Sequence, residues 1–323
     1  MDIRTGITEN MVTDDVSESS KSRDGSLSLR PQGKSRRMRL LEKMGCFRNG
    51  THAVNILRAT SADDLYDAFR LVHDSYLEQD YLFPRFSGLH LRIFEAMPET
   101  AVFIAKANNK VVAVTCLIMD TGDLGLPSDK LFPEVMSSLR SNSCKLSEIT
   151  RWTISPEYRR TAIMTELLRA CFAHAVAHDG GAMLAAVSHA HQAFYETFCF
   201  KTVGSEPSSS PDIDDPVILV HLPFDEFFEQ MTAVPDHEPG DEAVLKSYFV
   251  SHNPYHERVG PWQESAQAAF SDRVFLRQLF VERTNFLTEC TDEELTVIRQ
   301  HWGEEIFLDI MGHNIIHGTF GIN

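Results

Sequence analysis

The sequence predicts an α/β domain followed by a helical extension, and two observations lead to this prediction. From residue 53 to about residue 222, β-rich apolar runs alternate with segments whose apolar residues recur at helical spacing. After residue 225 only the helical spacing recurs. We therefore expect a basic, disordered arm at 1–52, an α/β domain at 53–224 and a helical extension at 225–323.

The domain should begin with a strand and two helices. The strand covers 53–58, and the first helix covers 62–79, with Ser61 as its N-cap. A second helix is expected between Pro84 and Pro98, because these apolar residues recur at helical spacing: Leu89, Ile93, Phe94 and Met97.

The rest of the domain should alternate strands with helices. Asn108 and Asn109 predict a hairpin between two β-rich runs. The helix that begins at Ile163 has a clear apolar stripe. The elements expected after the hairpin are a short helix at 131–139, a strand at 146–154, the helix from Ile163, a strand at 182–188, a helix at 191–198, and strands after Cys199 and Asp215.

Charge is distributed unevenly along the 323 residues. The formal net charge is −16, which argues against a nucleic-acid binder. Residues 1–204 nevertheless hold 24 basic and 24 acidic side chains, so the whole excess of acid lies in the 22 acids after Gly204. The stretch from Arg30 to Arg48 carries seven bases and one acid. A short basic helix from Arg39 is expected there, either packed on the domain or docking a partner.

Cysteine usage and hydropathy indicate a cytoplasmic protein. The six cysteines are scattered and have no short metal-ligand spacing, so we expect free thiols and no metal. A His-x-His pair, His189 and His191, has no third ligand at a useful spacing. No apolar run is long enough for a membrane span, and the first 15 residues lack the apolar core of a signal peptide.

Three segments carry chemically useful side chains. Glu148 and Arg151 lie on the strand at 146–154, where regular alternation puts Thr150 and Trp152 on the face of Glu148. A bulge would bring Glu148 and Arg151 together, and a structural ion pair is the simpler interpretation of the two residues. The second segment is the turn Ser155-Pro156-Glu157-Tyr158-Arg159-Arg160, which connects the strand to the next helix. The free backbone N–H groups at the N-terminus of that helix should point toward whatever lies beyond the end of the strand. The third segment is HQAFYETFCF, residues 191–200.

Each segment also has a simpler explanation. Arg159 and Arg160 are typical of a solvated face, and Tyr195 is typical of a packed aromatic residue. The three segments taken together, in this order along the predicted strands and helices, nevertheless resemble the GNAT superfamily of N-acyltransferases. PEYRR with the following helix resembles its acyl-donor element, and HQAFYETFCF resembles its FYE-x-x-GF signature, with Cys199 in place of glycine.

Within that superfamily the chain resembles the N-acyl amino acid synthases, relatives of the acyl-homoserine lactone synthases. The segments that carry this resemblance are AFRLVHDSYLEQDYLF, VFIAKANNKVVAVTCLI, LGLPSD, LSEITRWTISPEYRR and HAHQAFYETFCF, within residues 54 to about 222. The resemblance implies a central, mixed, mostly antiparallel sheet flanked by helices. It also implies transfer of an acyl group from a thioester to an amine.

That reaction suggests roles for the residues above. Glu148 would act as the base that deprotonates the amine, directly or through a water. Arg151 would fix Glu148 or bind the carboxylate of the acceptor. Tyr195, by the resemblance, would protonate the leaving thiolate, with His191 as a second proton carrier. The donor would lie along Trp152, Thr153, Ile154, Arg159, Arg160 and Thr161, with backbone N–H groups of 148–154 holding the oxyanion.

The donor loop departs from the superfamily pattern. Residues 159–164 contain no glycine, and side chains there would crowd a diphosphate bound to the backbone. This favours acyl carrier protein (ACP), with a single phosphodiester, over acyl-CoA, and no permanently bound cofactor is expected. A CoA-dependent acetyltransferase and a non-catalytic domain that senses an acyl ligand remain alternatives.

The acyl chain itself needs an apolar site. The candidates lie in the first two predicted helices and in the segment that connects them. Ordinary core packing is the alternative role for most of them. They are Phe69, Val72, Tyr76, Tyr81, Leu82, Phe83, Leu89 and Phe94.

Overall fold

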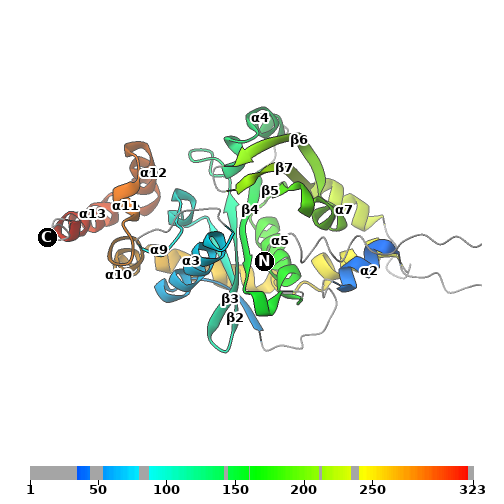
Figure 1. Cartoon of the computed structure of the whole chain (residues 1–323), viewed down its shortest axis with the longest axis horizontal. Coiled ribbons are helices and arrows are strands. Elements are labelled where there is room, and N and C mark those ends of the chain that lie inside the picture. Colours follow the sequence, from blue (N-terminus) through cyan, green and yellow to red (C-terminus); the bar gives the residue numbers. More distant parts are fainter. Residues whose placement is uncertain are drawn as a thin grey trace, which may run out of the picture.

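Helices cover both faces of a central β-sheet (Figure 1). The computed structural model describes residues 35–43, 54–79, 87–141, 145–159, 161–210, 213–233 and 240–318. Helix α5 (Ile163–Ala177) packs on one face of the sheet, and α3 (Ala62–Leu77) packs on the other. We call these the α5 face and the α3 face. Within the described ranges, no helix has the length and apolar character needed to cross a membrane.

The sheet has seven strands in the order β1-β2-β3-β4-β5-β7-β6. Their bounds are β1 (Val54–Arg58), β2 (Ala101–Ala107), β3 (Lys110–Met119), β4 (Leu146–Ile154), β5 (Ala182–Ser188), β6 (Lys201–Ser210) and β7 (Ile213–Pro223). All neighbours pair antiparallel except β4 and β5, which run parallel. The predicted fold class, a GNAT-like mixed and mostly antiparallel sheet with flanking helices, is therefore confirmed.

The parallel strands β4 and β5 separate soon after they begin. They pair from Leu146 opposite Ala182 to Glu148 opposite Leu184, although β4 continues to Ile154 and β5 to Ser188. We call the unpaired stretch, Ile149–Ile154 facing Ala185–Ser188, the open ladder. Backbone groups along the open ladder lack the strand partner that neighbouring strands normally provide.

Local sequence signals account for the starts and turns of several elements. Ser61 caps α3 as predicted, because its hydroxyl accepts a hydrogen bond from the Asp64 N–H at 3.2 Å. Asn108 and Asn109 both have positive φ, 49° and 61°, which suits the predicted hairpin turn between β2 and β3. The other helices and turns of the domain are η1 (Ile93–Ala96), η2 (Pro127–Asp129), α4 (Pro133–Ser141), η3 (Pro156–Tyr158), η4 (His189–His191) and α6 (Gln192–Thr197).

The predicted second helix between Pro84 and Pro98 is wrong for the part that is described. Residues 89–92 have no helical hydrogen bonding, and the helical part is the short 3₁₀ turn η1. Arg92 has extended dihedral angles (φ −123°, ψ 169°), and Met97 is extended because Pro98 follows it. Residues 80–86 lie outside the described residues, and with them the candidates Tyr81, Leu82 and Phe83.

The C-terminal extension is helical and passes from one face of the sheet to the other. Phe249 packs in the core of the α5 face, and Phe280 packs in the core of the α3 face. Between them α9 crosses the β1 edge, where Arg58 donates a hydrogen bond to Gln263 at 2.6 Å. The elements are α7 (Phe224–Thr232), α8 (Asp241–Leu245), the π-helix η5 (Lys246–Ser251), η6 (His256–Arg258), α9 (Val259–Phe270), α10 (Arg273–Arg277), the π-helix η7 (Gln278–Glu282), α11 (Phe286–Glu289), α12 (Asp292–Trp302) and α13 (Glu304–Gly318).

One helix of the N-terminal arm is described, α2 (Arg36–Lys43). It overlaps the short basic helix expected from Arg39, and Leu41 on it is fully buried in the core of the α5 face. The disorder predicted for the rest of the arm falls on residues 1–34 and 44–52, which lie outside the described residues.

Candidate active site

Glu148 lies at the start of the open ladder and is 1% exposed. Both of its carboxylate oxygens are held by Ser128 on η2: the backbone N–H donates at 3.0 Å and the hydroxyl at 2.8 Å. Burial raises the pKa of Glu148 to about 7, against the hydrogen bonds from Ser128 and the charge of Arg92, which lower it. A carboxylate with a pKa near neutrality can accept a proton and release it again at physiological pH.

A β-bulge at Arg151 changes the direction of the side chains along β4. Thr150 pairs with Cys116 and Thr153 with Val114, so two residues of β4 face one of β3, and Arg151 has a φ of +57°. The predicted alternation is therefore wrong beyond Thr150. Trp152 packs on the α5 face, opposite to the α3 face of Glu148.

The bulge does not join Arg151 to Glu148. Instead, Arg151 Nε donates to Glu95 Oε1 at 2.8 Å, so the simpler interpretation of an ion pair with Glu148 is wrong. Arg92 donates to the same carboxylate from its backbone N–H at 2.7 Å and from its side chain at 2.8 Å. Arg92 also donates to Thr150 at 3.0 Å, which ties this cluster to β4. We call Arg92, Glu95 and Arg151 the buried charge cluster.

The buried charge cluster has more donors than acceptors. Glu95 is 2% exposed and faces two guanidinium groups, and against the effect of burial the charges of Arg151 and Arg92 lower its pKa to about 2. Arg151 Nη1 and Nη2 are buried without a hydrogen-bond partner among the described residues. These two nitrogens are suitable donors for an incoming carboxylate.

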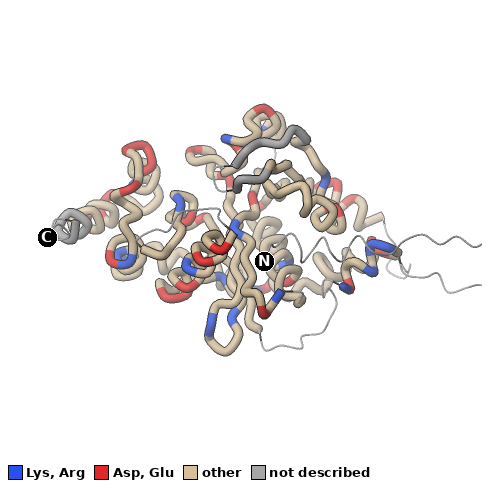
Figure 2. The backbone as a smooth tube through the Cα atoms, in the orientation of Figure 1, with Lys and Arg blue, Asp and Glu red and all other residues tan. Residues whose placement is uncertain are grey.

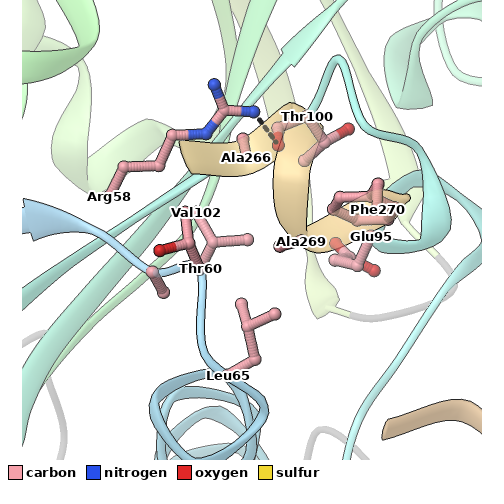
Figure 3. Close-up of a pocket in the computed structure, with 10 residues that line it drawn as sticks. Arg58, Thr60, Leu65, Glu95, Thr100, Val102, Ala266, Ala269 and Phe270 are labelled. Carbon is pink, nitrogen blue, oxygen red and sulfur yellow. Dashed lines mark hydrogen bonds between the residues drawn. The ribbon is translucent and has the colours of Figure 1, made fainter. Parts of the chain in front are cut away.

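A cavity beside Glu95 has a volume of only about 10 Å³, which is room for about one water molecule (Figure 3). Arg58 borders it and donates to the Thr100 carbonyl. Ala266 and Phe270 of α9 close it from the side of the extension. The extension therefore seals this side of the buried charge cluster from solvent.

Tyr195 lies on α6 and packs on Trp152, with ring centroids 6.0 Å apart in an edge-to-face arrangement. Its side chain is buried, and burial together with Cys171 raises the pKa of its hydroxyl. Tyr195 is therefore protonated at neutral pH. Because Tyr195 and Trp152 lie on the α5 face and Glu148 on the α3 face, the two proposed proton-transfer groups lie on opposite faces of the sheet.

The other predicted site residues lie around the end of the open ladder. His191 Nδ1 and Ser188 Oγ are 2.8 Å apart at the end of β5. Thr153 and Ile154 pair with β3 on one edge and belong to the open ladder on the other. Trp152 Nε1 is buried without a partner in the described part of the chain.

The turn into α5 carries the remaining donor-site predictions. Arg159 is half-buried after η3, and the Thr161 hydroxyl donates to the Tyr158 carbonyl at 2.7 Å. Arg160 lies outside the described residues. In the first turn of α5, Glu166 accepts hydrogen bonds from Tyr248 and Tyr255 of the extension. Glu166 is also paired with Arg169 Nη1 at 2.9 Å, so its charge is compensated within α5.

Three residues of this site were not singled out from the sequence: Ser128, Arg92 and Glu95. Ser128 lies in the LGLPSD segment, which contributed to the resemblance without a role for its serine. Arg92 and Glu95 had one local signal, their i, i+3 spacing. Of the acyl-site candidates, Phe69, Val72 and Leu89 are core residues on the α3 face, and Tyr76 and Phe94 are partly buried against the same core.

The chain matches one protein family. Residues 67–223 match the model of the N-acyl amino acid synthase FeeM family. A comparison with curated proteins gives no match.

Solved structures of acyltransferases are similar at low identity. FeeM, an N-acyl amino acid synthase from uncultured soil microbes, is 17% identical, with coverage of 55% of this chain and 93% of FeeM and a TM-score of 0.48. The CoA-dependent acyl-homoserine lactone synthase BjaI is 15% identical over 68% of this chain and 98% of its own, with a TM-score of 0.45. The acyl-homoserine lactone synthase LasI is 15% identical over 53% and 90%, with a TM-score of 0.41.

Proposed function

We propose that this N-acyltransferase, whose residues 67–223 match the model of the N-acyl amino acid synthase FeeM family, transfers a long-chain acyl group from ACP to the amine of an amino acid. The observation that carries this proposal is Glu148, a buried carboxylate with a pKa of about 7 at the start of the open ladder. An ACP donor places the reaction in the cytoplasm.

In the proposed reaction Glu148 is the base. An amino-acid ammonium group is mostly protonated at neutral pH, so one proton must leave before its nitrogen can attack. Glu148 takes this proton, directly or through a water, and the nitrogen then forms a bond to the thioester carbonyl carbon. Free backbone N–H groups of the open ladder support the oxyanion that develops, and the C–S bond then breaks.

Tyr195 is the proposed acid for the departing thiolate. Its raised pKa keeps the phenol protonated, and its position on Trp152 puts it on the α5 face. We assign the acceptor to the α3 face, beside Glu148, and the leaving sulfur to the α5 face. His191, at the end of β5, is the second proton carrier.

Arg151 is proposed to bind the acceptor's carboxylate. The alternative role, fixing Glu148, does not fit the hydrogen bond of Arg151 to Glu95. Two buried nitrogens of Arg151 without partners among the described residues support the assignment. The proposal therefore favours amino acids over simple amines.

The donor is proposed to bind along Trp152, Thr153 and Ile154, with its phosphate near Arg159, Arg160 and Thr161. The glycine-free turn favours the single phosphodiester of ACP over the diphosphate of CoA. A CoA-dependent acetyltransferase and a non-catalytic acyl sensor are the competing functions.

The experiment supplies purified protein with long-chain acyl-ACP and a mixture of amino acids, and mass spectrometry follows the products. We expect N-acyl amino acids, and at least tenfold less product from the decarboxylated amine of the preferred amino acid. Product from acyl-CoA alone would favour the acetyltransferase. Thermal stabilisation by acyl-ACP without any product would favour the sensor.

A Ser128→Ala variant should shift the pH dependence without abolishing the reaction. The hydroxyl of Ser128 stabilises the charged form of Glu148, so its loss raises the pKa of Glu148 above about 7. The acidic limb of the kcat profile should therefore move up by about one pH unit. The kcat at pH 9 should stay within about threefold of wild type, and an unmoved limb would show that Glu148 does not control it.

A further inference from the structure

Helix α2 presents a basic face to solvent. Arg36, Arg39 and Lys43 are all exposed, and their i, i+3, i+7 spacing puts them on one side of the helix. Leu41, on the opposite side, is fully buried in the core. Figure 2 shows this helix as a basic segment at the side of the molecule away from α10–α13. We call Arg36, Arg39 and Lys43 the α2 basic face.

Specific contacts hold α2 against the end of α6. Arg37 Nε donates to the Thr197 carbonyl at 2.9 Å, and its Nη2 donates to Cys199 Sγ at 2.9 Å. The third nitrogen of Arg37 pairs with Glu242 of α8 at 3.3 Å, which offsets a neighbouring acid. Because Arg37 is occupied in this way, it fixes the helix and leaves the other three bases for a partner.

This attachment brings the α2 basic face close to the proposed donor site. Thr197 and Cys199 lie within about one helical turn of Tyr195, which packs on Trp152 at the open ladder. A partner bound to the α2 basic face is therefore next to the place where its thioester has to enter. Residues 36–43 precede the part of the chain that matches the family, so the match assigns them no role.

We propose that the α2 basic face docks an acidic surface of the ACP that delivers the acyl group. The inference rests on the proposed function, because it takes ACP as the donor. Charge complementarity supports it: the chain carries −16 overall, and here three exposed bases lie together beside the donor site. Such a contact raises the rate of association and positions the thioester, and salt weakens it.

The test compares two double variants of the full chain. Arg36→Glu/Arg39→Glu reverses two charges of the α2 basic face. Arg70→Glu/Arg273→Glu reverses two exposed charges on α3 and α10, which belong to the α3 face. Each protein is assayed with acyl-ACP and with the same acyl group as a pantetheine thioester, which lacks the carrier protein.

For Arg36→Glu/Arg39→Glu we expect the KM for acyl-ACP to rise about tenfold or more, since several charge pairs are replaced by repulsion. Its kcat, and its KM for acyl-pantetheine, should stay within about twofold of wild type. The control variant should match wild type with both donors. Adding salt should raise the wild-type KM for acyl-ACP and should have a smaller effect on the α2 variant.

An unchanged KM for acyl-ACP in the α2 variant would overturn the inference. If the variant has a raised KM for both donors, Arg36→Lys/Arg39→Lys is measured next. Wild-type KM values in this variant support docking through positive charge. Raised KM values in this variant point to structural damage at α6 and contradict the inference. If wild type makes no product from either donor, the proposed function fails. The docking surface is then tested by fluorescence anisotropy, which measures the affinity of each protein for labelled holo-ACP. Equal affinities of wild type and the α2 variant, or no binding to wild type, would refute the inference.

Discussion

Replacing Glu148 by glutamine is expected to lower kcat by about 10²–10⁴, the range that a positioned general base contributes. Glutamine preserves the size of the side chain and can still accept a hydrogen bond from Ser128. It cannot take the proton from the ammonium group. The wild-type kcat, measured with both substrates saturating, should fall as the pH drops below about 7, because Glu148 becomes protonated there. The variant should be slow and nearly independent of pH.

The stability of the Glu148→Gln variant separates this effect from damage to the fold. The pKa of Glu148 is raised from 4.5 to about 7 in the folded protein, so its protonated form stabilises the fold below about pH 4.5. That contribution is lost as the pH rises through about 7, where burial of the charge becomes unfavourable. At pH 8 we therefore expect the variant to unfold at a temperature no lower than wild type.

Two control variants complete the measurement. Glu134→Gln makes the same change at an exposed position on α4 and should behave as wild type. Tyr195→Phe should retain more activity than Glu148→Gln, because solvent can protonate a thiolate once the C–S bond has broken. Full kcat in Glu148→Gln from mildly acidic to mildly basic pH would remove Glu148 from the role of base.

Elements with local signals were predictable from the sequence. The N-cap at Ser61 and the Asn108-Asn109 hairpin both depend on residues a few positions apart, and the structure has both. The periodic apolar stripes likewise predicted α5 and the helical extension. These signals are local because hydrogen bonds at helix ends and turns connect near neighbours in the chain.

The arrangement of the candidate site was less predictable. The bulge occurs at Arg151, and no glycine in the sequence marks its position. Regular alternation therefore predicts Trp152 on the face of Glu148, which is the wrong face. The partner of Arg151 is Glu95, 56 residues away, and tertiary packing alone brings them together. For the same reason the segment around Glu95 was mistaken for a helix: its apolar spacing resembles one, while its backbone is extended up to Arg92.

The second large effect concerns stability. A Glu95→Gln substitution is expected to reduce the free energy of unfolding by about 3–5 kcal/mol, because it leaves Arg92 and Arg151 buried without a counter-charge. Urea denaturation at pH 7 measures the loss, with Glu134→Gln as the exposed control. The folded-state pKa of Glu95 is about 2, so its stabilising contribution is present above about pH 4.5 and is lost as the pH falls toward 2. The difference between wild type and variant should shrink over that range.

A double variant identifies the source of this loss. Adding Arg151→Met to Glu95→Gln removes one of the two unpaired charges, so the double variant should recover part of the stability that Glu95→Gln loses. Arg151→Met alone should leave Glu95 paired with Arg92 and should lower stability less than Glu95→Gln. If Glu95→Gln loses under about 1 kcal/mol, water must solvate the two arginines. Water would then bind the two nitrogens of Arg151 in the free protein, and the acceptor's carboxylate would have to displace it.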